Sequence, residues 1–129
     1  MYTFHIHSVI LYLEGRILRM WMVNPKHMCR QHLLGEHREC HNFFGTLCRH
    51  ISIKGYLDKG ELDPRLLIER HDELVREMLR RGWNHYSPID TVDYSYVQLP
   101  DHCCIDKDKS RDLLFSRCER CREQRKKYE

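Results

Sequence analysis

A ten-residue run in the first third of the chain concentrates side chains that can carry out chemistry. Residues 30–39 hold seven basic, acidic or amide groups: Arg30, Gln31, His32, Glu36, His37, Arg38 and Glu39. Glutamine, histidine and arginine donate hydrogen bonds to phosphates and to the edges of bases. A glutamate among such groups can act as a general acid or base, or stabilise a developing cation. Composition by itself favours a solvated helix face, so the functional interpretation depends on the residue types and their spacing.

The spacing of these residues matters if they lie on a helix. Gln31 and Arg38 are seven residues apart. His32, Glu36 and Glu39 follow one another at steps of four and three. Such steps place side chains on neighbouring faces of a helix. A helix over this run would therefore bring hydrogen-bond donors next to carboxylates.

A long helix is predicted to carry the run. Asn24 can accept hydrogen bonds from the first free amides, and Pro25 suits the first helical position because its missing N–H has no partner there. Apolar residues then recur near helical spacing: Met28, Leu33, Cys40, Phe43, Phe44 and Leu47. Gly35 and Gly45 each weaken the helix by up to ~1 kcal/mol relative to alanine. We expect one helix from about Pro25 to His50.

The middle of the chain predicts a second helix after a loop. Residues 51–62 contain two glycines and are typical of a loop, and Asp63-Pro64 repeats the capping signal. An apolar stripe at the spacing of one helix face follows: Leu67, Leu74, Val75, Met78 and Leu79. Arg80 and Arg81 complement the negative end of this helix, and Gly82 supplies the residue after its C-cap.

The last third of the chain predicts one more helix. Residues 83–105 hold two prolines and several aromatic residues, which favours irregular packing. A helix is expected from about Ser110, with four residues on one side: Leu113, Leu114, Cys118 and Cys121. The sequence therefore predicts an all-α fold, a compact single domain of about three helices with long irregular connections.

Length and composition set limits on the class of protein. The chain has 129 residues, 22 Lys and Arg against 19 Asp and Glu, and a net charge of +3, which is too weak to establish nucleic-acid binding. It contains no apolar run of the length that a membrane span needs. Seven cysteines cannot all pair internally. With no secretory signal, reduced thiols and a cytoplasmic location are expected.

Two segments resemble a known family. The run QHLLGEHRE (31–39), followed by Phe44-Gly45, resembles the first helix of the pyrimidine-dimer DNA glycosylases, the endonuclease V-like family of phage. The run ERHDELVREMLRRGWNH (69–85) resembles the second long helix of that family and its basic-Gly-aromatic-Asn ending. The resemblance covers roughly residues 19 to 88.

The resemblance implies a small, all-helical, monomeric repair enzyme that acts on ultraviolet-damaged double-stranded DNA without a cofactor. In such enzymes an N-terminal α-amine attacks the sugar C1′ of the damaged nucleotide. A Schiff base forms, and β-elimination then cuts the strand, which is the AP-lyase and endonuclease activity. An α-amine has a pKa of about 8, so a useful neutral fraction exists near neutral pH. A carboxylate beside C1′ would stabilise oxocarbenium charge.

The family's functional residues can be carried over by position. The catalytic glutamate falls on Glu39. The DNA-contacting glutamine, histidine and arginine fall on Gln31, His32 and Arg38. The family has a further pocket arginine where this chain has Asn42. Because of this departure, the resemblance does not define which DNA lesion the protein acts on.

The amine is the main departure, because its position falls near Leu18 or Arg19, inside the chain. Three interpretations follow: a true start at Leu18 and a domain of residues 18–129; an extension, residues 1–17, that folds back to present Met1; or a protein that binds DNA without catalysis. The extension itself could form a short strand around residues 4–10 or a loose segment.

The late cysteines give a rival hypothesis. Cys103, Cys104, Cys118 and Cys121, with His102, could supply soft ligands for zinc. The alternative function is then a non-catalytic DNA-binding module stapled by zinc. A basic tail over residues 117–129 would be solvated or would contact phosphates. A third possibility is a small helical interaction protein with solvated charged faces.

Overall fold

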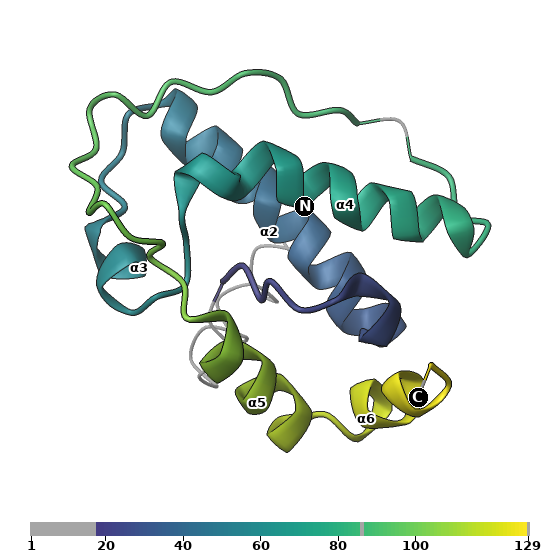
Figure 1. Ribbon diagram of the computed structural model, residues 1–129. Coiled ribbons are helices and arrows are strands. Elements are labelled where there is room, and N and C mark those ends of the chain that lie inside the picture. The colour runs from purple at the N-terminus through teal and green to yellow at the C-terminus, as the bar shows by residue number, and fades with distance from the viewer. Residues whose placement is uncertain (1–17, 86, 129) are drawn as a thin grey trace, which may run out of the picture.

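The computed structural model describes residues 18–85 and 87–128, and all regular structure in this part of the chain is helical. The elements in chain order are η1 (Pro25–His27), α2 (Arg30–Cys48), α3 (Lys54–Asp58), η2 (Pro64–Leu66), α4 (Leu67–Arg80), α5 (Lys107–Arg117) and α6 (Glu119–Lys126). The all-α prediction is confirmed (Figure 1). The interpretations of residues 1–17 lie outside the described residues.

The first predicted helix is divided in two. Asn24 caps η1 as expected, since its side chain accepts a hydrogen bond from the Lys26 amide at 3.1 Å. Met28 then adopts an extended backbone (φ −90°, ψ 139°), so α2 begins only at Arg30. The extended residues at 28 and 29 explain why the start predicted at Pro25 belongs to a separate turn.

The second predicted helix is confirmed, and the short helical turn η2 directly precedes it. Asp63 caps η2 through the Arg65 amide, and α4 follows directly. Most of the apolar stripe is buried, but Leu79 is 54% exposed. Successive residues differ by about 100° around a helix, so Leu79 falls outside the face that buries Met78. Gly82 has the positive φ of +85° expected after a C-cap.

Helices α2 and α4 pack against each other and form the centre of the core (Figure 1). A buried ion pair joins them. The Arg70 guanidinium donates to both carboxylate oxygens of Glu36, at 2.7 and 2.8 Å, and both side chains are almost fully buried. The pair fixes the register of the two helices, because any shift would leave two desolvated charges apart.

The C-terminal segment differs from the single helix that was predicted. Cys118 has an extended backbone (φ −120°, ψ 106°), which separates α5 from α6. Helix α6 packs against η1, and Gln124 donates to the Lys26 carbonyl at 3.3 Å. The basic run predicted as a tail is therefore folded. The loop predicted over 51–62 also contains the short α3. Among the described residues, no helix has both the length and the apolarity needed to cross a bilayer.

Candidate active site

The carboxylate of Glu39 contacts the main chain of the segment that precedes η1. Its Oε2 accepts a hydrogen bond from the Arg19 backbone nitrogen at 2.8 Å. The next residue is also held, since the Met20 amide donates to the Glu61 carbonyl at 2.7 Å. Glu39 lies on α2, half-buried, and Arg19 is 20 residues earlier in the chain. The fold thus brings together the two positions that were predicted for catalysis.

The environment of Glu39 favours its neutral form. The pKa of this carboxyl is raised to about 8, with burial as the main cause; the hydrogen bond from the Arg19 amide opposes the shift, and the nearby Glu36 contributes to it. A carboxyl of this kind can hold a proton at neutral pH. A cation placed beside it would favour the carboxylate.

The side chain of Arg19 is held at the edge of a cavity. Its guanidinium donates to the Ser110 hydroxyl at 2.9 Å and lies 4.3 Å from the centre of the Trp21 ring. Ser110 in turn donates to the Trp21 carbonyl at 2.6 Å. Burial lowers the pKa of Arg19, and the carboxylate of Glu61 opposes that shift. Helix α5 therefore fixes the direction of this arginine.

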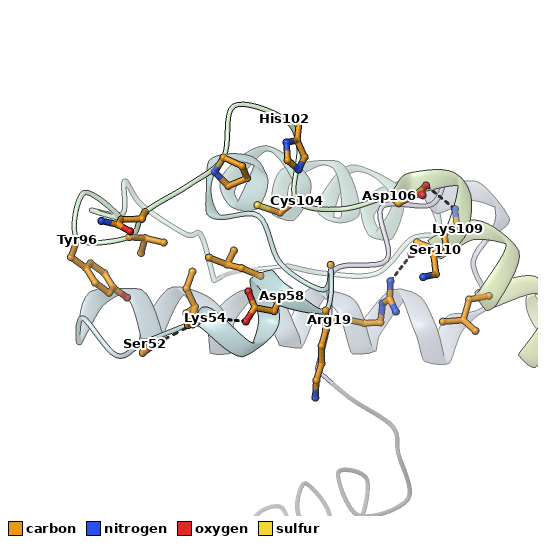
Figure 2. A pocket seen from close by; sticks show the side chains of 18 of the residues that line it. Arg19, Ser52, Lys54, Asp58, Tyr96, His102, Cys104, Asp106, Lys109 and Ser110 are labelled. Carbon is orange, nitrogen blue, oxygen red and sulfur yellow. Dashed lines mark hydrogen bonds and ion pairs between the residues drawn. The ribbon is translucent and has the colours of Figure 1, made fainter.

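The cavity has a volume of about 810 Å³ and lies between α3, the 96–106 loop and the start of α5 (Figure 2). Its basic groups include Arg19, Lys54, Lys59 and Lys109. Lys54 pairs with Asp58 at 2.7 Å. Small-molecule sites have volumes of about 300–1,000 Å³, so the cavity lies within the size range of a ligand site.

A comparison of the chain with models of protein families shows which family contains Arg19 and Glu39. The model described as pyrimidine dimer DNA glycosylase matches residues 18–91, more than half of the chain. The chain belongs to this family. No curated protein and no solved structure matches the chain at a significant level. Membership in a DNA glycosylase family identifies DNA as the substrate class and places both Arg19 and Glu39 inside the matched region. The resemblance stated from the two helix motifs is confirmed.

The other predicted site residues of this glycosylase family member lie in three different environments. Gln31, Arg38 and Asn42 are exposed on α2. Their steps of seven and four place them on one face of that helix. Leu18 is half-buried beside the core. His32 is turned toward sulfur instead, with its Nδ1 3.3 Å from the Cys29 Sγ.

The structure does not bring the four cysteines of the zinc hypothesis together. Cys118 and Cys121 converge instead with Cys29 and His32, and one sulfur or nitrogen atom from each of these four residues lies within 4.8 Å of the others. Cys103 is exposed, and the sulfur of Cys104 lies 3.8 Å from the Arg65 guanidinium. The sequence held a signal for this cluster, since Cys29 and His32 repeat the x₂ spacing of Cys118 and Cys121. Hydrogen bonds with Cys121 and His32 lower the pKa of Cys29, and the hydrogen bond with Cys29 raises the pKa of Cys121.

The structure also contains a cluster of histidines that the sequence did not lead us to predict. One ring nitrogen from each of four histidines lies within 4.8 Å of the others: His37, His41, His71 and His85. Burial is the main cause that lowers the pKa of His37 to about 4, and it also lowers the pKa of His41 and His85. The only sequence signal was the i, i+4 spacing of His37 and His41, because the other two residues come from α4 and the segment after it.

Proposed function

We propose that the protein is a DNA glycosylase with AP-lyase activity that acts on pyrimidine dimers in ultraviolet-damaged duplex DNA. The observation that carries the proposal is the 2.8 Å hydrogen bond between the Arg19 main-chain nitrogen and Glu39. The chemistry needs a nitrogen nucleophile beside a carboxylate, and the family match covers both positions.

The nucleophile in this proposal is an α-amine at residue 18 or 19. In the printed sequence both nitrogens are peptide nitrogens, whose lone pairs are delocalised and do not attack carbon. A protein that starts at Leu18 carries the amine on its initiator residue, or on Arg19 if the initiator is removed. Such an amine has a pKa of about 8 and reacts in its neutral form.

The reaction proceeds in three steps under this proposal. The amine forms a bond to C1′ while the glycosidic bond breaks, and the bonding electrons leave with the base, which takes up a proton. The C1′–O4′ bond then opens, O4′ takes the proton that the nitrogen loses, and a protonated imine forms. Loss of a proton from C2′ and departure of the 3′ phosphate cut the strand. Glu39 stabilises the positive charge at C1′ and relays a proton.

Binding of the damaged duplex is assigned to two exposed regions. Gln31, Arg38 and Asn42 share one face of α2, where donors can reach phosphates or base edges. The basic groups around the cavity offer further phosphate contacts. Extruding a nucleotide costs a few kcal/mol, least where pairing is already damaged, and these contacts offset that cost.

Borohydride trapping tests the proposal. The chain as printed and a version that begins at residue 18 (Leu18→Met) are each incubated with a duplex that contains one cyclobutane dimer. We expect a covalent protein–DNA complex with the version that begins at residue 18, and none with its Glu39→Gln variant. Absence of a trapped complex from both versions would refute the assignment.

The second candidate function is a DNA-binding module without catalysis. The observation that favours it is that the nitrogen beside Glu39 is a peptide nitrogen in the printed chain. It predicts binding that weakens steeply with salt and leaves the strand intact. The trapping experiment separates the two functions.

A further inference from the structure

We propose that Cys29, His32, Cys118 and Cys121 bind a zinc ion that fastens the C-terminal helices to the start of α2. This site lies outside the proposed reaction, because Glu39 and Arg19 supply none of its ligands. Two of its four ligands also lie beyond residue 91, where the family match ends.

The distances fit tetrahedral coordination. Zinc binds thiolate sulfur at about 2.3 Å and imidazole nitrogen at about 2.0 Å, so neighbouring ligand atoms lie about 3.3–3.8 Å apart. The Cys29 Sγ lies 3.3 Å from the His32 Nδ1 and 3.8 Å from the Cys118 Sγ. The Cys121 Sγ lies 3.7 Å from the same His32 nitrogen. The four side chains therefore form a closed set of three sulfurs and one nitrogen.

Backbone amides support the sulfur atoms. The Cys29 amide donates to the Cys121 Sγ at 3.2 Å, and the Cys121 amide donates to the Cys118 Sγ at 3.4 Å. Such N–H···S bonds stabilise thiolates and orient them toward a metal. They also explain the break at Cys118, whose extended backbone lets its own side chain cap α6.

The site accounts for the folding of α6. Among the eight residues of this helix, all of them described, only Cys121 is buried. Helices shorter than about 12 residues are marginal in water, and α6 has little apolar surface to compensate. The separation of 89 positions between Cys29 and Cys118 makes a metal bridge an effective tie between the two ends of the domain.

Metal analysis of the full chain tests this zinc site. We expect Cys118→Ser/Cys121→Ser to lose one zinc per chain relative to the wild type, and the matched control Cys103→Ser/Cys104→Ser to lose none. Cobalt exchanged into the wild-type protein reports the ligands even if a variant fails to fold. We expect the intense near-ultraviolet charge-transfer absorption of thiolate ligands. Unchanged zinc in the first variant, cobalt without that absorption, or a disulfide among these cysteines would overturn the proposal.

The four histidines carry a second, independent inference. We infer that His37, His41, His71 and His85 bind a divalent transition-metal ion between α2 and α4. The Nε2 atoms of His41 and His71 are 3.2 Å apart. The Nε2 atoms of His37 and His85 are buried, with no hydrogen-bond partner among the described residues. Four imidazoles that converge in this way leave unsatisfied nitrogens that a metal would satisfy.

A neighbouring carboxylate orients this cluster. The Asp72 Oδ1 lies 2.9 Å from the His71 Nδ1, which leaves the His71 Nε2 facing the other rings. Carboxylates that hold the second nitrogen of a ligand histidine are common around zinc. His37 lies two residues before Glu39 on α2, and His41 lies two residues after it. Each is therefore about 200° around the helix from Glu39, so the metal would be on the opposite face of α2 from the proposed reaction.

The same metal analysis distinguishes the two sites. We expect two zinc ions per wild-type chain and one after His37→Gln/His85→Asn, with the thiolate absorption of cobalt intact. The control His50→Gln/His102→Asn, at two exposed histidines, should retain both ions. One ion per wild-type chain that is lost with the cysteine variant, or two ions kept by the histidine variant, would overturn the histidine site and leave the cysteine site standing.

Discussion

The Glu39 carboxylate accepts a hydrogen bond from the main-chain nitrogen of Arg19 across 2.8 Å. This contact depends on the placement of α2, which the buried Glu36–Arg70 pair ties to α4. It also depends on the segment before η1, which the Met20–Glu61 backbone hydrogen bond holds. The position proposed for the reacting amine thus lies beside the glutamate, and the predictions below follow from that arrangement.

Glu39→Gln should abolish strand cutting while retaining DNA binding. The amide cannot stabilise cationic charge at C1′ or relay a proton, and groups of this kind contribute about 10²–10⁴-fold to rate. Nicking of a dimer-containing duplex and its binding are measured separately. Glu69→Gln, an exposed glutamate on α4, is the control and should cut normally. Full activity of the Glu39 variant would remove this residue from the mechanism.

Arg70→Met should destabilise the fold by about 3–5 kcal/mol, because it leaves Glu36 as an unpaired buried charge. Urea unfolding at neutral pH gives the free energy. A double variant, Glu36→Leu/Arg70→Met, replaces both charges by apolar groups and should recover much of the loss. An equally large loss in the double variant would show that the pair contributes through shape alone.

Asp63→Asn should make stability less dependent on pH in acid. Burial raises the pKa of Asp63, but hydrogen bonds from the side chain and backbone of Arg65 and from the Cys104 amide lower it more, to a net value below the ordinary 3.8. The stabilisation is therefore complete above pH 3.8 and is lost as the pH falls through the folded value. The wild type should exceed the variant by about 1–3 kcal/mol at pH 6, and the difference should shrink toward pH 2.

Unfolding of the wild type and Asp63→Asn is compared at several pH values between 2 and 6. The proposed metal sites are the same in both proteins, so their contribution cancels in the difference. A difference that stays constant over this range would show that the Asp63 charge does not contribute.

Arg38→Ala should weaken DNA binding uniformly across sequences. The side chain is exposed on the face that also carries Gln31 and Asn42, where a phosphate contact is expected. Loss of one such contact lowers the slope of log affinity against log salt by about one. Arg111→Ala is the control, since that arginine lies on α5 and pairs with Asp108 and Asp112. An unchanged slope for Arg38→Ala would contradict the assigned DNA face.

Local signals in the sequence predicted much of the fold. The stripe that contains Leu67, Leu74 and Met78 identified α4 because its burial follows from helical period alone. The caps at Asn24 and Asp63 were likewise predicted, since capping needs only residues nearby in sequence. The breaks at Met28 and Cys118 could not be predicted in this way. Cys29, which follows Met28, contacts Cys118 and Cys121, and these residues lie far along the chain.

The candidate site shows the same contrast between features that local sequence signals predict and features that depend on distant contacts. Glu39 and the amine position were predicted through a family motif, and the structure brings them into contact. The four cysteines of the zinc hypothesis do not converge, because Cys118 and Cys121 meet Cys29 and His32 through tertiary packing. Cysteine spacing indicates pairs of ligands but does not indicate which pairs converge.

The most direct test of the central claim is the identity of the residue that carries the trapped sugar. After borohydride reduction of the residue-18 version on dimer-containing DNA, the complex is digested and its peptides are sequenced by mass spectrometry. We predict that the adduct lies on the α-amine of residue 18 or 19. An adduct on a lysine of the cavity, Lys54, Lys59 or Lys109, would contradict the account.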